Sequence, residues 1–235
     1  MKPAVPAACL LVAAAALAAA HAPGPAQADD PTARRPLVRE VWIDERRGDV
    51  LIDLEDRTQN LTGFRGDHTV RDVQVCPDGR HALVWHHGEY PPLEVTTVRI
   101  ADGKRIASFC PGFGGELRWT PDDNIVHWWG VSTGVWTVQI RSISGVLVLE
   151  AGGSGVAVSP GARWVATFPL QAVDGDIRVY ETGRGRLVHL DVPGERFSVD
   201  RADWSGDANL HLRYTTFDEA GPTGTHHLRL ALTPR

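Results

Sequence analysis

The residues best suited to chemistry are histidines, acids and tryptophans that lie in polar stretches far apart in the sequence. The most concentrated of these stretches is His86, His87, Gly88, Glu89 and Tyr90. Imidazole and carboxylate groups are common zinc ligands, so a metal site could form here with His127 or with His226-His227. Neighbouring residues of a strand point to opposite faces, however, so both histidines of this stretch would reach one ion only from an irregular loop. We predict a ligand-binding loop here and no metal site.

Trp129 and two acidic groups are the other candidates for a ligand-binding face. Trp129 follows Trp128 at the end of an apolar segment and could stack on a sugar or an extended peptide, although tryptophans also fill protein cores. Asp174 and Asp218 belong to short acidic stretches whose oxygens could hold calcium, yet neither has the spacing of a known calcium loop. Paired carboxylates could also serve a glycosidase. Because no catalytic set is recognisable, we predict no catalytic residue and no cofactor.

A segment that occurs four times indicates which elements carry these residues. Each copy combines alternating apolar residues with a Pro, Gly or Asp turn and a second apolar stretch. The four turn segments are Val73–Arg80, Leu117–Asn124, Ala157–Arg163 and Ala202–Asn209. The apolar stretches after them are His81–Trp85, Ile125–Trp129, Trp164–Phe168 and Leu210–Tyr214. This pattern predicts strands with tight turns, because no segment after residue 28 keeps the apolar spacing of a helix.

A second hairpin follows each of the first three copies. These hairpins are Val98–Phe109, Trp136–Leu149 and Ile177–Leu190. Each period of about 40 to 45 residues then holds four short strands, which is the length and strand number of a β-propeller blade. We predict an all-β fold, a small β-propeller of four-stranded antiparallel blades, with a two-sheet sandwich as the structural alternative.

The turn segments resemble those of known propeller repeats. The segments Cys76–Arg80, Trp119–Asp123, Ser159–Gly161 and Trp204–Asp207 are similar to the turns of TolB-type and WD40-like β-propellers. The resemblance covers about residues 68–233. Ala162 and Ala208 depart from the pattern at turn positions, and no Trp-Asp dipeptide closes a blade. The resemblance implies a propeller fold and, because such folds host many functions, no particular activity.

The four copies favour a propeller of four blades, and five blades are possible. The last copy lacks a fourth strand, whereas Val38–Ile43 and Val50–Leu54 are spare strands near the N-terminus. One of the spare strands could complete the last blade and join the chain ends. We expect the longer loops, including His86–Glu94 and Thr215–His226, to converge on one face and to carry the ligand.

The first 28 residues are predicted to be an export signal. Lys2 precedes an apolar run from Ala8 to Ala20, and Ala26-Gln27-Ala28 offers small residues to a signal peptidase. The run is too short to cross a bilayer as a helix. We therefore expect a signal peptide over residues 1–28, a flexible leader over residues 29–37 and a single propeller domain over residues 38–235. The protein would then be secreted or periplasmic, with no membrane span after cleavage.

Two cysteines, Cys76 and Cys110, lie beyond the predicted signal, and the sequence is compatible either with a disulfide between them or with two free thiols. Export favours a bridge between Cys76 and Cys110. The blade geometry places Cys76 near one face and Cys110 near the opposite face, which is too far apart for a bridge.

Charge and scaffold together favour a binding protein. The net charge is −5, and residues 1–28 hold one Lys and no acid, so the mature part is slightly more acidic. This acidity argues against nucleic acid and anionic membranes as partners. We predict an exported non-catalytic binding module for a protein, peptide or cell-envelope ligand. The alternatives are a carbohydrate-active hydrolase or lyase that uses loop acids at the propeller axis, and a structural domain of an envelope complex.

Overall fold

The computed structural model describes residues 37–63, 69–87, 93–112, 115–130, 134–171, 173–191, 193 and 196–233. These residues belong to one compact unit, residues 34–235. The predicted signal peptide and nearly all of the leader lie outside the described residues. Every helix or strand in the described part is a β-strand, so the all-β prediction is confirmed.

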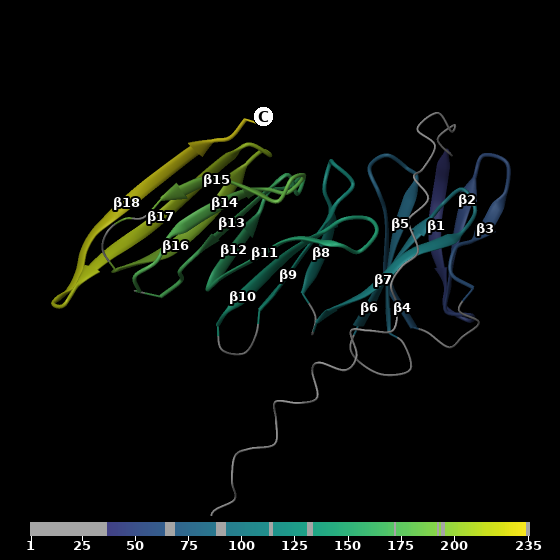
Figure 1. Cartoon of the computed structure of the whole chain (residues 1–235), viewed down its shortest axis with the longest axis horizontal. Helices are drawn as coiled ribbons and strands as arrows, with labels where there is room; N and C mark the ends of the chain where they lie inside the picture. The colour runs from purple at the N-terminus through teal and green to yellow at the C-terminus, as the bar shows by residue number, and fades with distance from the viewer. Residues whose placement is uncertain are drawn as a thin grey trace, which may run out of the picture. The chain divides into compact units, whose positions relative to one another are not determined.

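The strands form five antiparallel sheets, each built from strands that are consecutive in sequence (Figure 1). The first sheet holds β1 (Val38–Asp44), β2 (Asp49–Leu54) and β3 (Thr58–Asn60). The second holds β4 (Thr69–Val75), β5 (His81–His87), β6 (Leu93–Arg99) and β7 (Lys104–Gly112). The third holds β8 (Glu116–Trp119), β9 (Ile125–Gly130), β10 (Trp136–Arg141) and β11 (Leu147–Gly153). The fourth holds β12 (Gly155–Val158), β13 (Trp164–Phe168), β14 (Ile177–Glu181) and β15 (Arg186–Asp191), and the fifth holds β16 (Arg196–Ser205), β17 (Asn209–Asp218) and β18 (Gly221–Ala231).

The repeated turn segments form the hairpins between the first two strands of the second, third and fourth sheets. In the fourth sheet, the Ser159 hydroxyl accepts a hydrogen bond from the Trp164 N–H at 3.1 Å. Thr120 accepts one from the Asn124 N–H at 3.0 Å in the third sheet, and the Cys76 Sγ accepts one from the His81 N–H at 3.1 Å in the second. A short side chain that bonds to the backbone beyond the turn favours this local geometry. The similar turn sequences therefore produce the same hairpin three times.

Each sheet is packed against the next by a shared hydrophobic core. The four clusters combine Val50 and Val84, Trp85 and Trp119, Val138 and Val165, and Trp164 and Phe197, respectively. The second strand of each middle sheet supplies both sides, because successive side chains point to opposite faces. In β5, Ala82 and Val84 face the first sheet, whereas Leu83 and Trp85 face the third. This repetition is the packing of propeller blades, which confirms the predicted fold class.

The structure corrects two details of the prediction. The described residues form five sheets, so the alternative of five blades replaces the favoured number of four. The N-terminal strands β1 and β2 do not complete the last sheet, because β1 pairs with β2 and β2 pairs with β3 in a sheet of their own. Among the described residues, no strand ladder and no core cluster joins the first sheet to the last.

The predicted loop Thr215–His226 is also different in the structure. Residues of β17 continue as far as Asp218, and β18 begins at Gly221 after a tight turn. The threonines of this segment and His226 therefore belong to a long hairpin, with Thr215 paired to Thr225.

Candidate binding groove on the last sheet

The first three junctions between neighbouring sheets share one packing feature. The turn between the third and fourth strands of each sheet lies on the outermost strand of the sheet before it. A methyl group at Gly103 would lie 3.1 Å from the Gln59 side chain on β3, and one at Gly145 would lie 3.3 Å from the Cβ of Ala107 on β7. At Gly185 it would lie 2.8 Å from the Val148 side chain on β11. These turns therefore close the outer side of each junction.

The fourth junction has a groove at the corresponding place. The fifth sheet has three strands, so β18 is its last strand and no described turn covers β15. The groove has a volume of about 300 Å³. Its walls are Arg186, Leu187, Val188 and His189 of β15, the stretch Leu230–Thr233 at the end of β18, and Trp164. The groove is thus the space that a third-to-fourth-strand turn fills at the other junctions.

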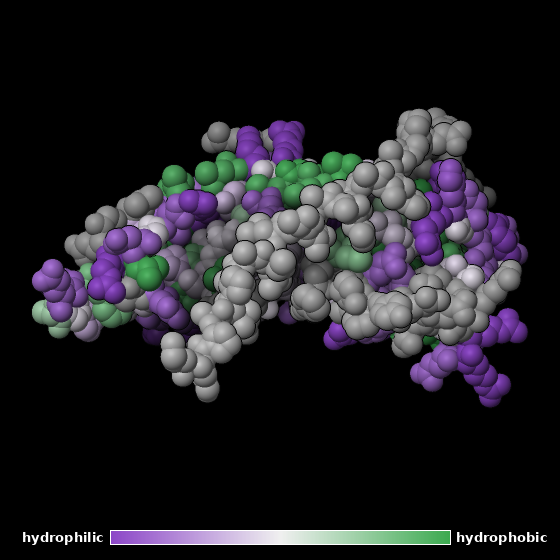
Figure 2. Space-filling model, turned by 60° about the horizontal axis from the view of Figure 1, so that its bottom comes forward, coloured by the Kyte–Doolittle hydropathy of each residue, from purple (hydrophilic) through white to green (hydrophobic). Residues whose placement is uncertain are grey.

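The outer strands of the third and fourth sheets expose hydrophobic side chains. Leu187 is 44% exposed and Leu190 is 51% exposed, both on β15. The adjacent outer strand β11 and its turn expose Val146, Leu147 and Val148. Figure 2 shows that hydrophobic residues gather along one margin of the surface in view. Apolar side chains on the outermost strands of sheets mark places where another chain can pack.

The outward face of the last sheet is rich in basic residues. A shallow hollow of about 210 Å³ lies on this face, and its charged and imidazole walls are Arg201, Asp203, His211, Arg213, His227 and Arg229. Arg201 pairs with Asp203 at 2.5 Å, and Arg213 lies 3.6 Å from Asp200. Within the described chain, Arg229 has no acidic partner. This face therefore carries positive charge next to the free side of β18.

The ligand residues expected from the sequence lie on separate sheets. His86 is buried in β5, where its Nε2 lies 2.9 Å from the Thr96 hydroxyl, and His87 at the end of the same strand is exposed. Trp129, at the end of β9, is half-buried and stacks on His127 with ring centroids 4.5 Å apart. Asp174 is exposed next to the bridge that Val173 makes with Phe197.

Asp218 has a local role in the turn between β17 and β18. Its carboxylate accepts hydrogen bonds from the Ala220 and Gly221 N–H groups at 2.7 and 3.0 Å. Glu89 and Tyr90 lie outside the described residues. The last copy was expected to have three strands, as the described residues do, and an N-terminal strand was expected to complete it, so the groove was not predicted.

Cys76, Asp78 and His81 form a compact group of possible metal ligands. Their ligand atoms all lie within 4.8 Å of one another. Burial and the hydrogen bond to Asp78 at 2.6 Å together raise the pKa of the Cys76 thiol to about 12. A metal binds the thiolate, so this environment opposes binding. The Cys76 sulfur accepts the same hydrogen bond in its turn that the Ser159 hydroxyl accepts in the equivalent turn. This bond explains a small side chain with a lone pair at position 76.

Cys76 and Cys110 are both free thiols, so the structure contains no bridge between them. Cys76 is buried and Cys110 is exposed. The geometric argument against the disulfide therefore agrees with the structure. Burial also raises the pKa of the Cys110 thiol.

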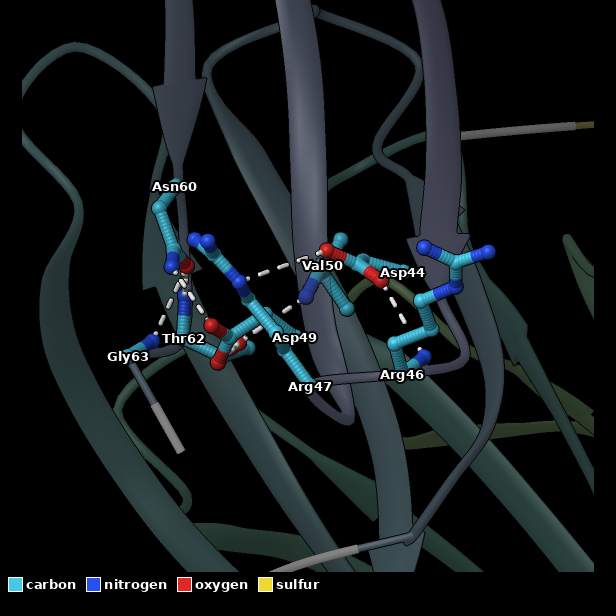
Figure 3. Close-up of polar contacts among 8 residues, drawn as sticks. All are labelled: Asp44, Arg46, Arg47, Asp49, Val50, Asn60, Thr62 and Gly63. Atoms are coloured by element: carbon cyan, nitrogen blue, oxygen red, sulfur yellow. Dashed lines mark hydrogen bonds and ion pairs between the residues drawn. The ribbon is translucent and has the colours of Figure 1, made fainter. Parts of the chain in front are cut away.

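A second polar group, at the first sheet, holds its short third strand in place (Figure 3). The buried Asp49 carboxylate accepts a hydrogen bond from Asn60 at 2.8 Å and one from the Thr62 hydroxyl at 3.3 Å. The Asn60 side-chain oxygen accepts bonds from the Thr62 and Gly63 N–H groups. The Thr62 hydroxyl accepts a further bond from the Val50 N–H at 2.9 Å. These bonds satisfy one another within the protein, so we assign the group to structure.

In the described part of the chain, no helix could cross a membrane. No protein-family model and no curated protein sequence matches the chain.

The solved structures similar to this chain include several propeller proteins. The β-propeller domain of Cps50 (Swd1) from Myceliophteria thermophila is 14% identical, with a TM-score of 0.37 and coverage of 79% of this chain and 67% of that one. TolB from Acinetobacter baumannii is 15% identical, with a TM-score of 0.38 and coverage of 83% and 52%. A prolyl endopeptidase is 16% identical, with a TM-score of 0.44 and coverage of 76% and 31%. This chain thus spans about a third to two thirds of the length of those chains. This likeness does not extend to activity, ligand or partner.

Proposed function

We propose that the protein is an exported, non-catalytic binding module whose groove between β15 and β18 holds a protein or peptide ligand. The observation that carries this proposal is the difference between the four junctions. Three are closed by a turn, and the fourth presents a groove of about 300 Å³ with exposed leucines beside it. A groove at a place that the fold itself fills elsewhere with polypeptide is suited to polypeptide from another source.

Export is supported by the sequence of the first 28 residues, whose charge, apolar run and small residues fit a signal peptide. Cleavage after Ala28 would release the unit into the periplasm or the medium. The ligand would then be a secreted, periplasmic or envelope protein.

The alternative of a carbohydrate-active enzyme requires loop acids that converge with Trp129. Asp218 is instead occupied with the backbone of its own turn, and Trp129 is stacked on His127. These contacts support the binding module over the hydrolase or lyase.

Site-specific photocrosslinking in the producing cells tests the proposal. A photoreactive phenylalanine analogue would replace Thr233, which is exposed in the groove wall, or Thr58, which is exposed on the first sheet. We expect a discrete crosslinked protein from position 233 and none from position 58. The crosslink should disappear when Leu187→Glu alters the opposite wall. No crosslink at 233, or the same products at both positions, would contradict the proposed site.

A further inference from the structure

The outward face of the last sheet carries two neighbouring rows of charged and imidazole side chains. β16, β17 and β18 are paired antiparallel, and each row crosses all three strands. The first row holds Arg201, Arg213 and His227, and the second holds Asp203, His211 and Arg229. All six side chains line the shallow hollow of about 210 Å³. The strand register therefore gathers three arginines and two histidines around one depression.

The composition of this face differs from that of a face between two blades. On β17, Leu210 and Leu212 are buried in the core shared with the fourth sheet. The alternate residues His211 and Arg213 point to the opposite face, because successive side chains of a strand alternate. The junctions between neighbouring sheets are packed by apolar side chains, whereas the two rows hold no apolar residue. This face is therefore suited to a polar contact.

Two positive charges lie directly opposite each other in the first row. Arg201 of β16 is paired with Arg213 of β17, and arginine keeps its positive charge in proteins. Like charges at directly opposite positions destabilise a sheet. An anion placed between the two guanidinium groups would offset their repulsion. The register thus opposes folding stability at this place and favours the binding of an anion.

Two acids balance only part of the positive charge. The Asp203 carboxylate lies 2.5 Å from the Arg201 guanidinium, and the Asp200 carboxylate lies 3.6 Å from that of Arg213. These pairs restrict the positions of two arginines. Arg229 has no acidic partner within the described chain. The three arginines therefore leave an excess of positive charge at the hollow, and the two imidazoles add further hydrogen-bonding groups.

The chemistry of arginine indicates which anion would fit. A guanidinium group presents its N–H donors as a planar fork that matches the oxygens of carboxylates and phosphates. One such fork can engage both oxygens of a carboxylate, whereas a phosphate or sulfate group has further oxygens for arginines on other strands. A water molecule occupies about 30 Å³ in the liquid. A hollow of about 210 Å³ thus has room for a phosphate or sulfate group and part of a molecule that carries it.

We infer that the hollow binds a phosphate or sulfate group, either as the free anion or as part of a small molecule, between Arg201, Arg213 and Arg229. This site lies on the outward face of the last sheet and is distinct from the groove between β15 and β18. The inference does not depend on the ligand proposed for that groove.

Calorimetric titration of the mature chain tests the site with inorganic phosphate, sulfate, glucose 6-phosphate and acetate. The ionic strength would be held at about 0.15 M, where exposed charges farther apart than about 8 Å are largely screened. We expect saturable binding of phosphate and sulfate, and none of acetate at the same concentrations. Stronger binding of glucose 6-phosphate than of phosphate would assign the group to a larger molecule, and equal binding would assign the free anion.

Two arginine variants with the same change of charge locate the site. Arg229→Gln should weaken phosphate binding at least about tenfold, which is the loss expected for one hydrogen bond to a charged group. Arg39→Gln, at an exposed arginine of β1, should leave the affinity unchanged. Phosphate should also shift the NMR ring signals of His211 and His227, but not those of His189 in the groove wall.

Three results would overturn the anion site. The first is equal phosphate affinity of the unaltered chain and Arg229→Gln. The second is binding of acetate as strong as that of phosphate. The third is a phosphate-induced shift that leaves His211 and His227 unaffected. None of these results would alter the crosslinking test of the groove, because Thr233 and Leu187 do not line the hollow.

Discussion

The turn at Cys76 allows a direct test of the repeated hairpin. Cys76 is 3% exposed, and its sulfur accepts the hydrogen bond of the His81 N–H at 3.1 Å. Cys76→Ala would remove that acceptor from a buried donor, which costs about 1–3 kcal/mol. Cys76→Ser would keep an acceptor of the type that Ser159 provides in the equivalent turn, where it accepts from Trp164 at 3.1 Å. We expect the serine variant to be more stable than the alanine variant by about 1–2 kcal/mol.

Urea unfolding of the two variants, followed by tryptophan fluorescence and circular dichroism, measures this difference. The comparison is valid if the denaturant slopes agree, since the slope reports the surface exposed on unfolding. Ser159→Ala is the matched control, because it removes the same bond from the fourth sheet and should cost a similar amount. Equal stability of Cys76→Ala and Cys76→Ser would refute the hydrogen bond as the reason for a small polar residue at this position.

Three further predictions concern the core, the pH dependence and the export signal. Trp164 is 1% exposed in the core beneath the groove, so Trp164→Ala should destabilise the protein by about 3–5 kcal/mol in urea unfolding, and a loss below about 1 kcal/mol would contradict its place there. Burial alone would raise the pKa of Asp78, but hydrogen bonds from the Cys76 thiol and the Arg80 N–H lower it below its ordinary value. Its carboxylate should therefore contribute stability fully above the ordinary pKa and lose it as the pH falls through the lower folded-state pKa, so Asp78→Asn should flatten the urea midpoint between about pH 5 and pH 2, and an unchanged profile would contradict this role. Mass spectrometry of the exported protein should find a chain that begins at Asp29, whereas an intact N-terminus would contradict the signal peptide.

The hairpins were predictable because their causes are local. Alternating apolar residues, a short polar side chain and a turn with Pro, Gly or Asp are all present within a few residues of Cys76, Thr120 and Ser159. Each of these turns forms the predicted hairpin, with a backbone bond such as that from the Ser159 N–H to the Trp164 oxygen at 2.9 Å. The same pattern placed Trp129 at the end of a strand, but the prediction of a loop at His86 and His87 was wrong, because β5 extends through both residues and buries His86.

The partner of each terminal strand was not predictable in this way. β2 has the alternation of an ordinary strand, which is compatible either with the last sheet or with a sheet of its own. The choice depends on contacts distant in sequence: Asn60 and Thr62 bond to Asp49, and Val50 and Ile52 pack with Val84 in the second sheet. The local pattern of apolar and polar residues carries no information about contacts between residues so far apart in sequence.

The sequence by itself therefore determined the repeating unit: short strands, their turns and the count of strands in the last copy. Only the tertiary structure decided that the first strands form a separate sheet and that a groove remains where β15 meets the end of β18. The physical reason is that strand propensity and turn chemistry act over a few residues, whereas the location of a groove depends on which distant surfaces bury one another and which are left uncovered.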